Sequence, residues 1–255
     1  MKITIITVSY NSEKTIARTI ESILLQNYPD LEYLIIDGAS KDKTVEIAYS
    51  YKDKFQEKGI SYKVYSEPDK GIYDAMNKGI SHATGEIIGI LNSDDRYVDE
   101  HVLSTVAEPF QTNSNLDTCF GNLLYVKGNK PYRYWKSGKP RTFKFGWMPP
   151  HPAFFVRASV YRKYGLFRLD CGVNADYELM LRFLEKHQVS SLWINKLFVY
   201  MEAGGTSNQG IQSRIDGIHN DSLAWKKNEM IPLYFCLALK KLRKLPQFVY
   251  AQCIR

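Results

Sequence analysis

Two adjacent carboxylates, Asp94 and Asp95, follow the apolar run at residues 87–91. An apolar strand that ends in acidic side chains places them at the carboxyl edge of an open α/β sheet, where such sheets bind ligands. Neither Cys nor His stands next to the pair, so an oxygen donor set is expected, which suits a hard divalent cation bound to phosphate oxygens. The alternative is a plain strand-to-helix turn, because Asn92-Ser93-Asp94-Asp95 is also good turn and N-cap sequence.

A second acidic strand end occurs upstream, in the same phase of a repeat of strand and helix. Asp37 follows the apolar residues 34–36 and precedes Gly38-Ala39-Ser40. Because parallel strands end at the same edge of a sheet, the two acidic ends should face one ligand. The pair of strand ends therefore favours a binding site over an isolated turn, and a diphosphate is the expected ligand.

The elements that must position these side chains are indicated by the spacing of apolar residues, which is regular up to residue 110 and looser beyond it. Apolar strands that alternate with helices predict a mostly parallel sheet covered on both faces. We expect strands at 3–8, 34–36, 62–65, 87–91, 118–126, 132–135 and 191–201, and helices at 16–24, 45–51, 72–80, 102–110 and 175–187.

Several function classes are disfavoured by what the sequence lacks. The first strand-to-helix turn, residues 8–13, has no glycine, and no Gly-Lys-Ser or Gly-Lys-Thr occurs, so dinucleotide and P-loop sites are not expected. The four cysteines form no Cys-x-x-Cys pair, which argues against a zinc knuckle or disulfide framework and fits a reducing cytosol. The N-terminal apolar run is too short for a signal peptide.

Basic residues are concentrated late in this 255-residue chain of net charge +7. They are not spread along an aromatic platform, so no nucleic-acid partner is expected. Lys226-Lys227 and residues 240–244 flank apolar residues and predict a basic amphipathic helix that is too short to span a bilayer. Two interpretations stay open, a helix that packs back on the domain and a helix that touches a membrane surface.

Four ordered motifs resemble the family 2 glycosyltransferases of the GT-A fold, in particular the bacterial branch that builds O-antigen and capsular polysaccharides. They are TVSYN at residues 7–11, IDGASKD at 36–42, DKGIYDAMNKG at 69–79 and LNSDD at 91–95. Residues 150–155 and 174–179 match more loosely. The resemblance implies an α/β GT-A fold with a C-terminal helical extension, divided into a transferase domain at 1–225, with a nucleotide-sugar half at 1–110 and an acceptor half at 111–225, and a tail at 226–255.

The implied activity is inverting transfer of a sugar from a nucleotide-diphospho-sugar, with UDP favoured, to a saccharide or lipid-linked saccharide. The enzyme would be cytoplasmic or peripheral on the inner face of the membrane. Asp37 would accept a hydrogen bond from the imide N–H of a uracil, and Mg²⁺ or Mn²⁺ would bind Asp95, Asp94 or both, with His219 as an extra ligand. The implied donor-binding residues are Ser9, Asn11, Glu13, Asp37, Ser40, Lys70, Gly71, Asn77, Asn92 and Asp94.

An inverting enzyme also needs a general base, because the attacking hydroxyl must lose its proton. The family has a Glu-Asp pair where this chain has Ala175-Asp176, so Asp176 is the expected base and Glu178 the alternative. Since residues two apart on a helix point in different directions, only one should face the acceptor. His151 and Trp147 are expected on the acceptor side.

Two other classes share parts of this pattern. A nucleotidyltransferase acting on sugar phosphates would share the α/β plan, but should have a Gly-rich basic loop after the first strand. A non-catalytic sugar-binding subunit would keep the fold and lose the carboxylates. Hydrolysis of the donor separates the three.

Overall fold

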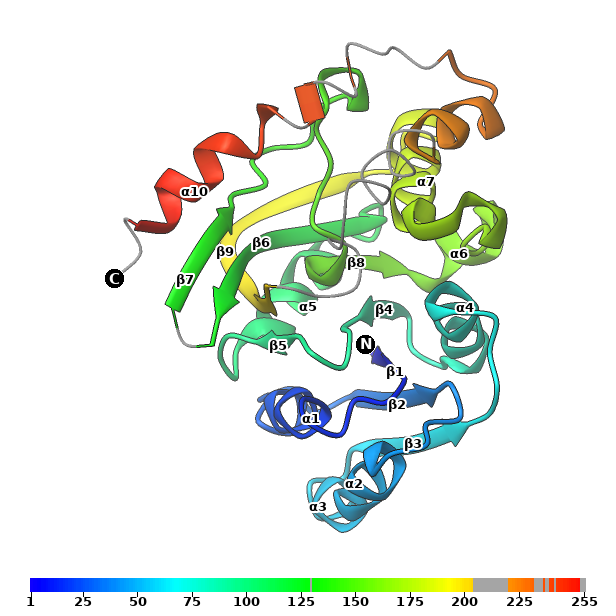
Figure 1. The fold of residues 1–255 in the computed structure, drawn as a ribbon, viewed down its shortest axis with the longest axis vertical. Coiled ribbons are helices and arrows are strands. Elements are labelled where there is room, and N and C mark those ends of the chain that lie inside the picture. The colour runs from blue at the N-terminus through cyan, green and yellow to red at the C-terminus, as the bar shows by residue number, and fades with distance from the viewer. Residues whose placement is uncertain (129, 204–219, 232–235, 237–238, 241, 253–255) are drawn as a thin grey trace.

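A mixed sheet runs through the molecule, with strand order β3-β2-β1-β4-β8-β6-β9-β5 and β7 paired to β6 (Figure 1). The computed structural model describes residues 1–255 except 129, 204–219, 232–235, 237–238, 241 and 253–255. The first four strands are parallel and bring the ends of β1 and β2 together, because Ser9 pairs with Asp37. They are β1 (Ile3–Ser9), β2 (Leu31–Asp37), β3 (Ser61–Ser66) and β4 (Ile87–Ile90).

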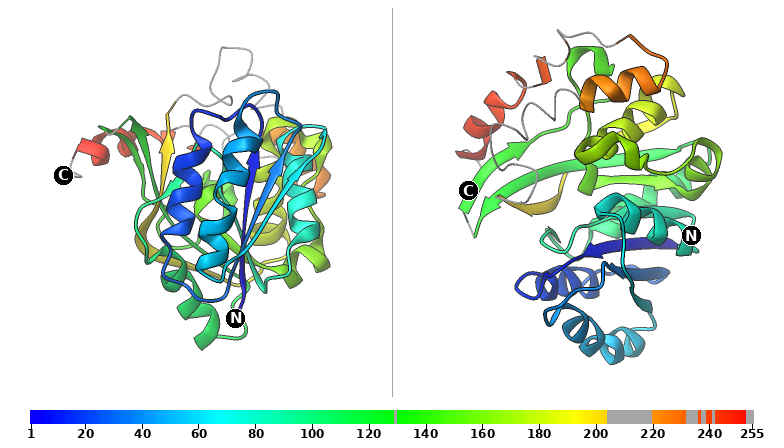
Figure 2. Two further views of the ribbon diagram at one scale, coloured as in Figure 1. Left: turned by 90° about the horizontal axis from the view of Figure 1, so that it is seen from below. Right: turned by 45° about the vertical axis from the view of Figure 1, so that its right-hand side comes forward.

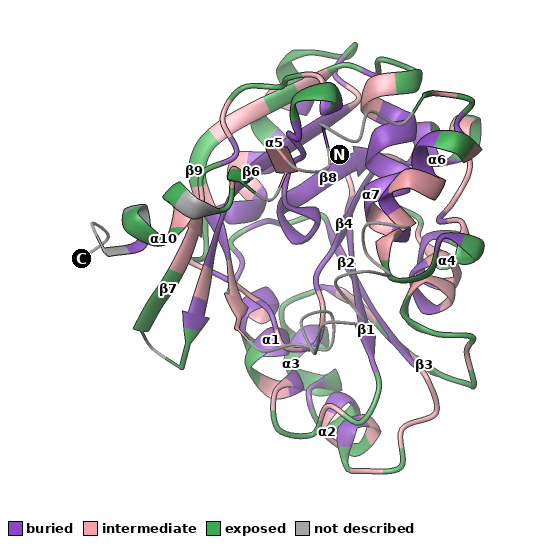
Figure 3. Cartoon of the chain, turned by 45° about the horizontal axis from the view of Figure 1, so that its top comes forward, coloured by how far each residue is buried: buried purple, intermediate pink, exposed green. Residues whose placement is uncertain are grey.

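Helices cover both faces of this parallel half, which explains the continuous apolar runs of its strands. Side chains alternate across a strand, so Ile6 packs in one core with Met76 of α4, whereas Ile5 packs in the opposite core with Ile20 of α1. Figure 3 shows β1, β2 and β4 as buried along their lengths. The helices are α1 (Ile16–Leu24), α2 (Thr44–Ser50), α3 (Lys52–Glu57), α4 (Ile72–His82) and α5 (Val102–Thr112).

Antiparallel pairing enters in the second half, where β8 inserts between β4 and β6. Most residue pairs across the sheet remain parallel, since β9 lies parallel to β6. The predicted fold class is confirmed. The remaining strands are β5 (Arg96–Tyr97), β6 (Thr118–Lys127), β7 (Lys130–Trp135), β8 (Phe154–Arg157) and β9 (Ser191–Glu202), and the helices are α6 (Ala158–Tyr164) and α7 (Ala175–Leu181), which a π-helical turn extends over Arg182–Lys186.

The described part of the tail packs on the domain. Helix α10 (Leu245–Gln252) lies along the outer side of β7, where Phe248 meets Tyr132 edge to face at 5.4 Å between ring centroids (Figure 2). A helical segment at 220–227 crosses the expected boundary at residue 225, and part of the predicted basic amphipathic extension at 226–255 lies outside the described residues. Within the described ranges, no helix has the length and apolar character needed to cross a bilayer.

Gly146 packs closely against the tail. Its φ is +69°, and a Cβ there would lie 2.3 Å from the backbone nitrogen of Lys240. Gly138 has nearly the same φ, +70°, with open space around it. The two glycines therefore form a matched pair, because an alanine at either suffers the same left-handed strain of about 1–2 kcal/mol, and only one meets the tail.

We expect Gly146→Ala to loosen the C-terminal segment and Gly138→Ala to leave it in place. Amide hydrogen exchange across residues 239–252 should speed up in the first variant only, with a larger fall in the free energy of unfolding. Equal exchange in the two variants would show that the tail is not held through this contact.

Candidate functional site

The loops that follow β1 and β2 are joined to each other by hydrogen bonds. The N–H of Asn11 donates to Ser40 Oγ at 2.8 Å, and Asn11 Oδ1 accepts from the N–H of Lys41 at 2.9 Å. Glu13 Oε2 accepts from the N–H of Lys43 at 3.1 Å. Asn11 adopts a left-handed φ of 48°, which asparagine tolerates better than most residues. The structure thus brings four predicted donor-binding residues together, Ser9, Asn11, Glu13 and Ser40.

Asp37 is fully buried at the end of β2 and is surrounded by donors. Its Oδ1 accepts from Ser9 Oγ at 3.1 Å and from Ser40 Oγ, and its Oδ2 accepts from the N–H of Ser40 at 2.9 Å and Ser66 Oγ at 2.8 Å. A carboxylate offers about four acceptor positions, so all are occupied. A nucleobase N–H would have to displace a serine hydroxyl, and the predicted base contact stays a prediction.

Lys70 and Gly71 form an exposed turn at the start of α4. Gly71 has φ 107°, and its N–H donates to Asp69 Oδ1 at 2.8 Å, while the N–H of Lys70 donates to Asp74 Oδ2 at 3.0 Å. A Cβ at Gly71 would find nothing within 4 Å. The glycine is required for the turn, and the turn leaves its backbone open to a ligand.

Asn77 has a different role from the one predicted. Its Nδ2 donates to the carbonyl of Phe167 at 2.9 Å, and its Oδ1 accepts from the N–H of Phe167 at 2.9 Å. Both ends of the side-chain amide are therefore used to hold the loop that precedes α7. The motif at 69–79 contributes a fold contact at this position rather than a donor contact.

The two acidic residues after β4 differ in environment. Asp95 is fully buried, and burial followed by the charge of Asp94 raises its pKa well above the ordinary value. Burial also raises the pKa of Asp94, with a contribution from Glu202. Asn92 Nδ2 donates to Asp95 Oδ2 at 3.2 Å, whereas Asp95 Oδ1 and Asn92 Oδ1 are buried with no partner among the described residues. Negative charge is concentrated here, and the charge of Arg18 and the hydrogen bond from Asn92 offset it only in part.

This arrangement fits a divalent cation that arrives with its own oxygen ligands. Within the described residues, no group of three or more His, Cys, Asp or Glu forms a complete metal site. The unpartnered oxygens of Asn92 and Asp95 are hard donors, and Mg²⁺ or Mn²⁺ commonly completes its shell with substrate phosphates. Asp95 and Asp94 would hold the cation, while His219 lies outside the described residues.

Asp176 lies in the first turn of α7, and its carboxylate can still accept further hydrogen bonds. Tyr73, which the sequence analysis did not single out, donates its O–H to Asp176 Oδ1 at 3.1 Å and to the carbonyl of Val173 at 2.9 Å. Burial and the charge of Asp176 raise the pKa of Tyr73 far above its usual range, so the phenol stays protonated and fixes the carboxylate. Burial lowers the pKa of His151, against the opposing charge of Asp176, and its imidazole is neutral at pH 7.

Glu178 is contradicted as an alternative base. It is fully buried, with Oε1 and Oε2 each 3.1 Å from Arg182 nitrogens. Asn228 donates to Oε1 at 3.0 Å, and Arg168 lies 3.3 Å away. The carboxylate ties α7 to neighbouring segments and does not line the cavity described next. The spacing of Glu178 and Arg182 by one helical turn was the signal in the sequence.

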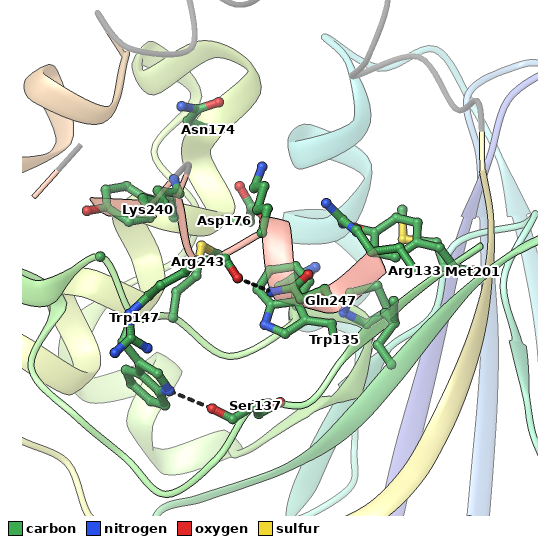
Figure 4. A pocket seen from close by; sticks show the side chains of 18 of the residues that line it. Arg133, Trp135, Ser137, Trp147, Asn174, Asp176, Met201, Lys240, Arg243 and Gln247 are labelled. Atoms are coloured by element: carbon green, nitrogen blue, oxygen red, sulfur yellow. Dashed lines mark hydrogen bonds between the residues drawn. The ribbon is translucent and has the colours of Figure 1, made fainter. Parts of the chain in front are cut away.

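A cavity of about 600 Å³ lies between α4, β6, β7, α7 and the C-terminal segment (Figure 4). Asp176, the predicted base, lines it together with His151 and Trp147, for which the acceptor side stays a prediction, and Asn92 lines it from the edge that carries Asp94 and Asp95. The indole N–H of Trp147 donates to the carbonyl of Ser137 at 2.9 Å, which fixes the ring. Sequence reasoning missed several lining residues, among them Tyr125, Arg133, Trp135 and Arg243.

The raised pKa of Asp95 has a consequence for stability. A carboxyl with a folded-state pKa above its unfolded value of about 3.9 stabilises the folded state at low pH, and this contribution is lost as pH rises through the folded pKa. At pH 7 and without a cation, burial of Asp95 therefore costs free energy of folding.

We expect Asp95→Asn in EDTA to have a higher melting temperature than the parent protein at pH 7, and the difference to disappear below about pH 4. Thermal unfolding across this pH range measures it. Asp53→Asn, at an exposed position on α3, serves as the control. A lower melting temperature for Asp95→Asn at pH 7 would contradict the assignment of a charge that is compensated only in part.

Comparison with known proteins places the chain among glycosyltransferases. A family model described as Glycosyl transferase family 2 matches residues 4–167. An uncharacterized glycosyltransferase of Mycobacterium tuberculosis is 33% identical over 190 residues, covering 71% of this chain and 68% of the relative. A PGL/p-HBAD biosynthesis glycosyltransferase of Mycobacterium bovis is 27% identical over 205 residues, covering 80% of this chain and 78% of the relative.

Two solved structures share the fold. S. aureus TarS 1–349 in complex with UDP-GlcNAc has a TM-score of 0.69 at 18% identity, covering 98% of this chain and 79% of that chain. The mannosyltransferase PcManGT from Pyrobaculum calidifontis, in complex with GDP-Man and Mn²⁺, has a TM-score of 0.68 at 16% identity, covering 99% of this chain and 74% of that chain. These likenesses confirm the predicted GT-A fold. Since the family model matches more than half of its residues, the chain belongs to glycosyltransferase family 2.

Proposed function

We propose that this protein is an inverting glycosyltransferase that moves a sugar from a nucleotide-diphospho-sugar to a hydroxyl of a saccharide acceptor. The observation that carries the proposal is the placement of Asp176 on the wall of a cavity that reaches Asn92, next to the Asp94–Asp95 pair. Burial raises the pKa of Tyr125, and the charges of both Asp95 and Asp176 add to this rise, so one phenol lies near both carboxylates. A base and a diphosphate site thus share one cavity.

The chemistry assigns each group one task. Asp176 accepts the proton of the acceptor hydroxyl, whose oxygen attacks the anomeric carbon as the bond from that carbon to the diphosphate breaks. Tyr73 orients the carboxylate of Asp176. A bound Mg²⁺ or Mn²⁺ would offset negative charge that develops on the leaving diphosphate. Lys70 and the open backbone of Gly71 would contact the donor from the start of α4.

The donor and metal are supported by analogy with structural neighbours. The TarS structure contains UDP-GlcNAc, and the PcManGT structure contains GDP-Man with Mn²⁺. We favour a UDP-linked sugar, with a nucleotide-sugar half at 1–110 and an acceptor half at 111–225. Membership of the family disfavours a nucleotidyltransferase, and donor hydrolysis would exclude a non-catalytic sugar-binding subunit.

We propose a role in cell-surface glycan synthesis at the cytoplasmic face of a membrane. The O-antigen and capsular pathways remain the prediction from the sequence, and the mycobacterial relative is named for PGL/p-HBAD biosynthesis. The described tail would contact the lipid, because Leu242 and Val249 are 56% and 64% exposed close to Lys240, Arg243 and Lys244. Packing on the domain and contact with lipid are compatible, since Leu242 and Val249 stay exposed while Phe248 packs on Tyr132.

Asp176→Asn and Glu178→Gln form a matched pair, two residues apart on one helix. The first should lower turnover by about 10²–10⁴ with little change in nucleotide affinity or stability, because it removes only the proton acceptor. The second should lower the free energy of unfolding by about 3–5 kcal/mol, since it leaves Arg182 buried and unpaired. Steady-state kinetics, nucleotide binding and urea unfolding separate the two effects. Full turnover in Asp176→Asn would exclude it as the base.

The membrane contact is tested by co-sedimentation with vesicles of phosphatidylglycerol and phosphatidylcholine. Leu242→Glu/Val249→Glu should reduce the bound fraction, and salt should weaken binding of the parent protein, because each basic residue near an anionic surface contributes about 1 kcal/mol. Leu25→Glu, at a 66% exposed position after α1, is the control. If the parent protein sediments equally with anionic and neutral vesicles, the electrostatic part of the proposal is wrong.

A further inference from the structure

The cavity carries far more positive than negative charge. Five of its lining residues are cationic, Arg133, Lys136, Lys240, Arg243 and Lys244, and Asp176 is the one carboxylate among the described lining residues. Lys240 is paired with a carboxylate, that of Asp221 at 2.8 Å. An uncharged saccharide gains little from such an excess, and each cation costs free energy when a ligand desolvates it.

Arg133 projects from β7 between aromatic side chains. Its guanidinium lies 3.8 Å from the ring centroid of Tyr125 and 5.8 Å from that of Trp135. Contact with aromatic faces holds the positive charge in place. Arg133 Nε is buried with no hydrogen-bond partner, and no carboxylate oxygen lies within 4 Å of the guanidinium, among the residues that the structure describes.

Arg243 enters the same cavity from the C-terminal segment. It is half-buried, and burial together with the positive charge of Arg141 lowers its pKa. Like Arg133, it has no carboxylate within 4 Å in the described part of the chain. Figure 4 shows both arginines among the side chains that line the cavity, together with Trp135 and Trp147.

We propose that the outer part of this cavity is a subsite for an anionic group of the acceptor, a phosphate or phosphodiester, bound by Arg133 and Arg243. The inference rests on the proposed function and specifies its acceptor class. Arg133 and Arg243 supply charge-assisted hydrogen bonds to the anion, and the indole of Trp135 packs against neighbouring apolar or sugar faces. The acceptor hydroxyl then lies toward Asp176.

The donor's diphosphate is the other anion that could reach these arginines, and the experiment separates the two sources. Binding of hexyl phosphate and of hexyl β-glucoside is measured by calorimetry with the nucleotide site saturated by UDP and Mn²⁺. The parent protein should prefer the phosphate. Arg133→Gln and Arg243→Gln should each lower the affinity for hexyl phosphate by about tenfold or more, because each removes a hydrogen bond to a charged group. The affinity of both variants for hexyl β-glucoside should equal that of the parent protein. The control Arg162→Gln, on α6, should bind hexyl phosphate and hexyl β-glucoside as the parent protein does.

Three results would overturn the proposal: no preference for phosphate in the parent protein, no loss in either variant, or a loss of UDP affinity that matches the loss for hexyl phosphate. The last would assign the arginines to the donor. Failure of the proposed function looks different, since the parent protein would then neither bind UDP with Mn²⁺ nor release nucleoside diphosphate from any sugar nucleotide.

Discussion

A carboxylate removed from water destabilises a folded chain unless hydrogen-bond donors or cations surround it. By this criterion the buried acidic residues of this molecule fall into two groups. Glu32 accepts from two threonines, Asp37 is enclosed by serines, and Glu178 is held by arginines. Asp95 is equally buried and has one oxygen with no described partner. The compensated acids named here join segments of the fold, and Asp95 is the one for which we propose a ligand. The division between scaffold and site follows from this difference.

The parallel half was predictable because its pattern depends on residues that are close together in the sequence. Strands buried on both faces must be apolar at successive positions, so the runs at 3–8, 34–36 and 87–91 predicted β1, β2 and β4. Their acidic ends lie at one edge because parallel strands end together. Asp37 is fully occupied and Asn77 is used by Phe167, which motif reading could not show, since both facts depend on partners distant in sequence.

The acceptor side was harder to predict for the same reason. Its walls come from α4, β7, α7 and the segment after residue 239, which meet only in the folded chain. Asp176 and Glu178 differ in sequence by two positions, yet one faces the cavity and the other an ion-pair network, as helical geometry requires. Arg133 alternates with aromatic residues along β7, a pattern that fits an exposed strand equally well until α10 is placed over it.

The close approach of Lys240 to Gly146 means that the cavity is walled partly by a segment outside the sheet. The donor half is a cooperative unit in which each strand supports its neighbours, so its sequence can change little without loss of the fold. The described part of the segment at 239–252 packs on β7 and Gly146 without joining the sheet. Under the proposed function, substitutions there would reshape the cavity while the edge that carries Asp94 and Asp95 stays intact, so that one scaffold would acquire new acceptors by variation in a single peripheral segment.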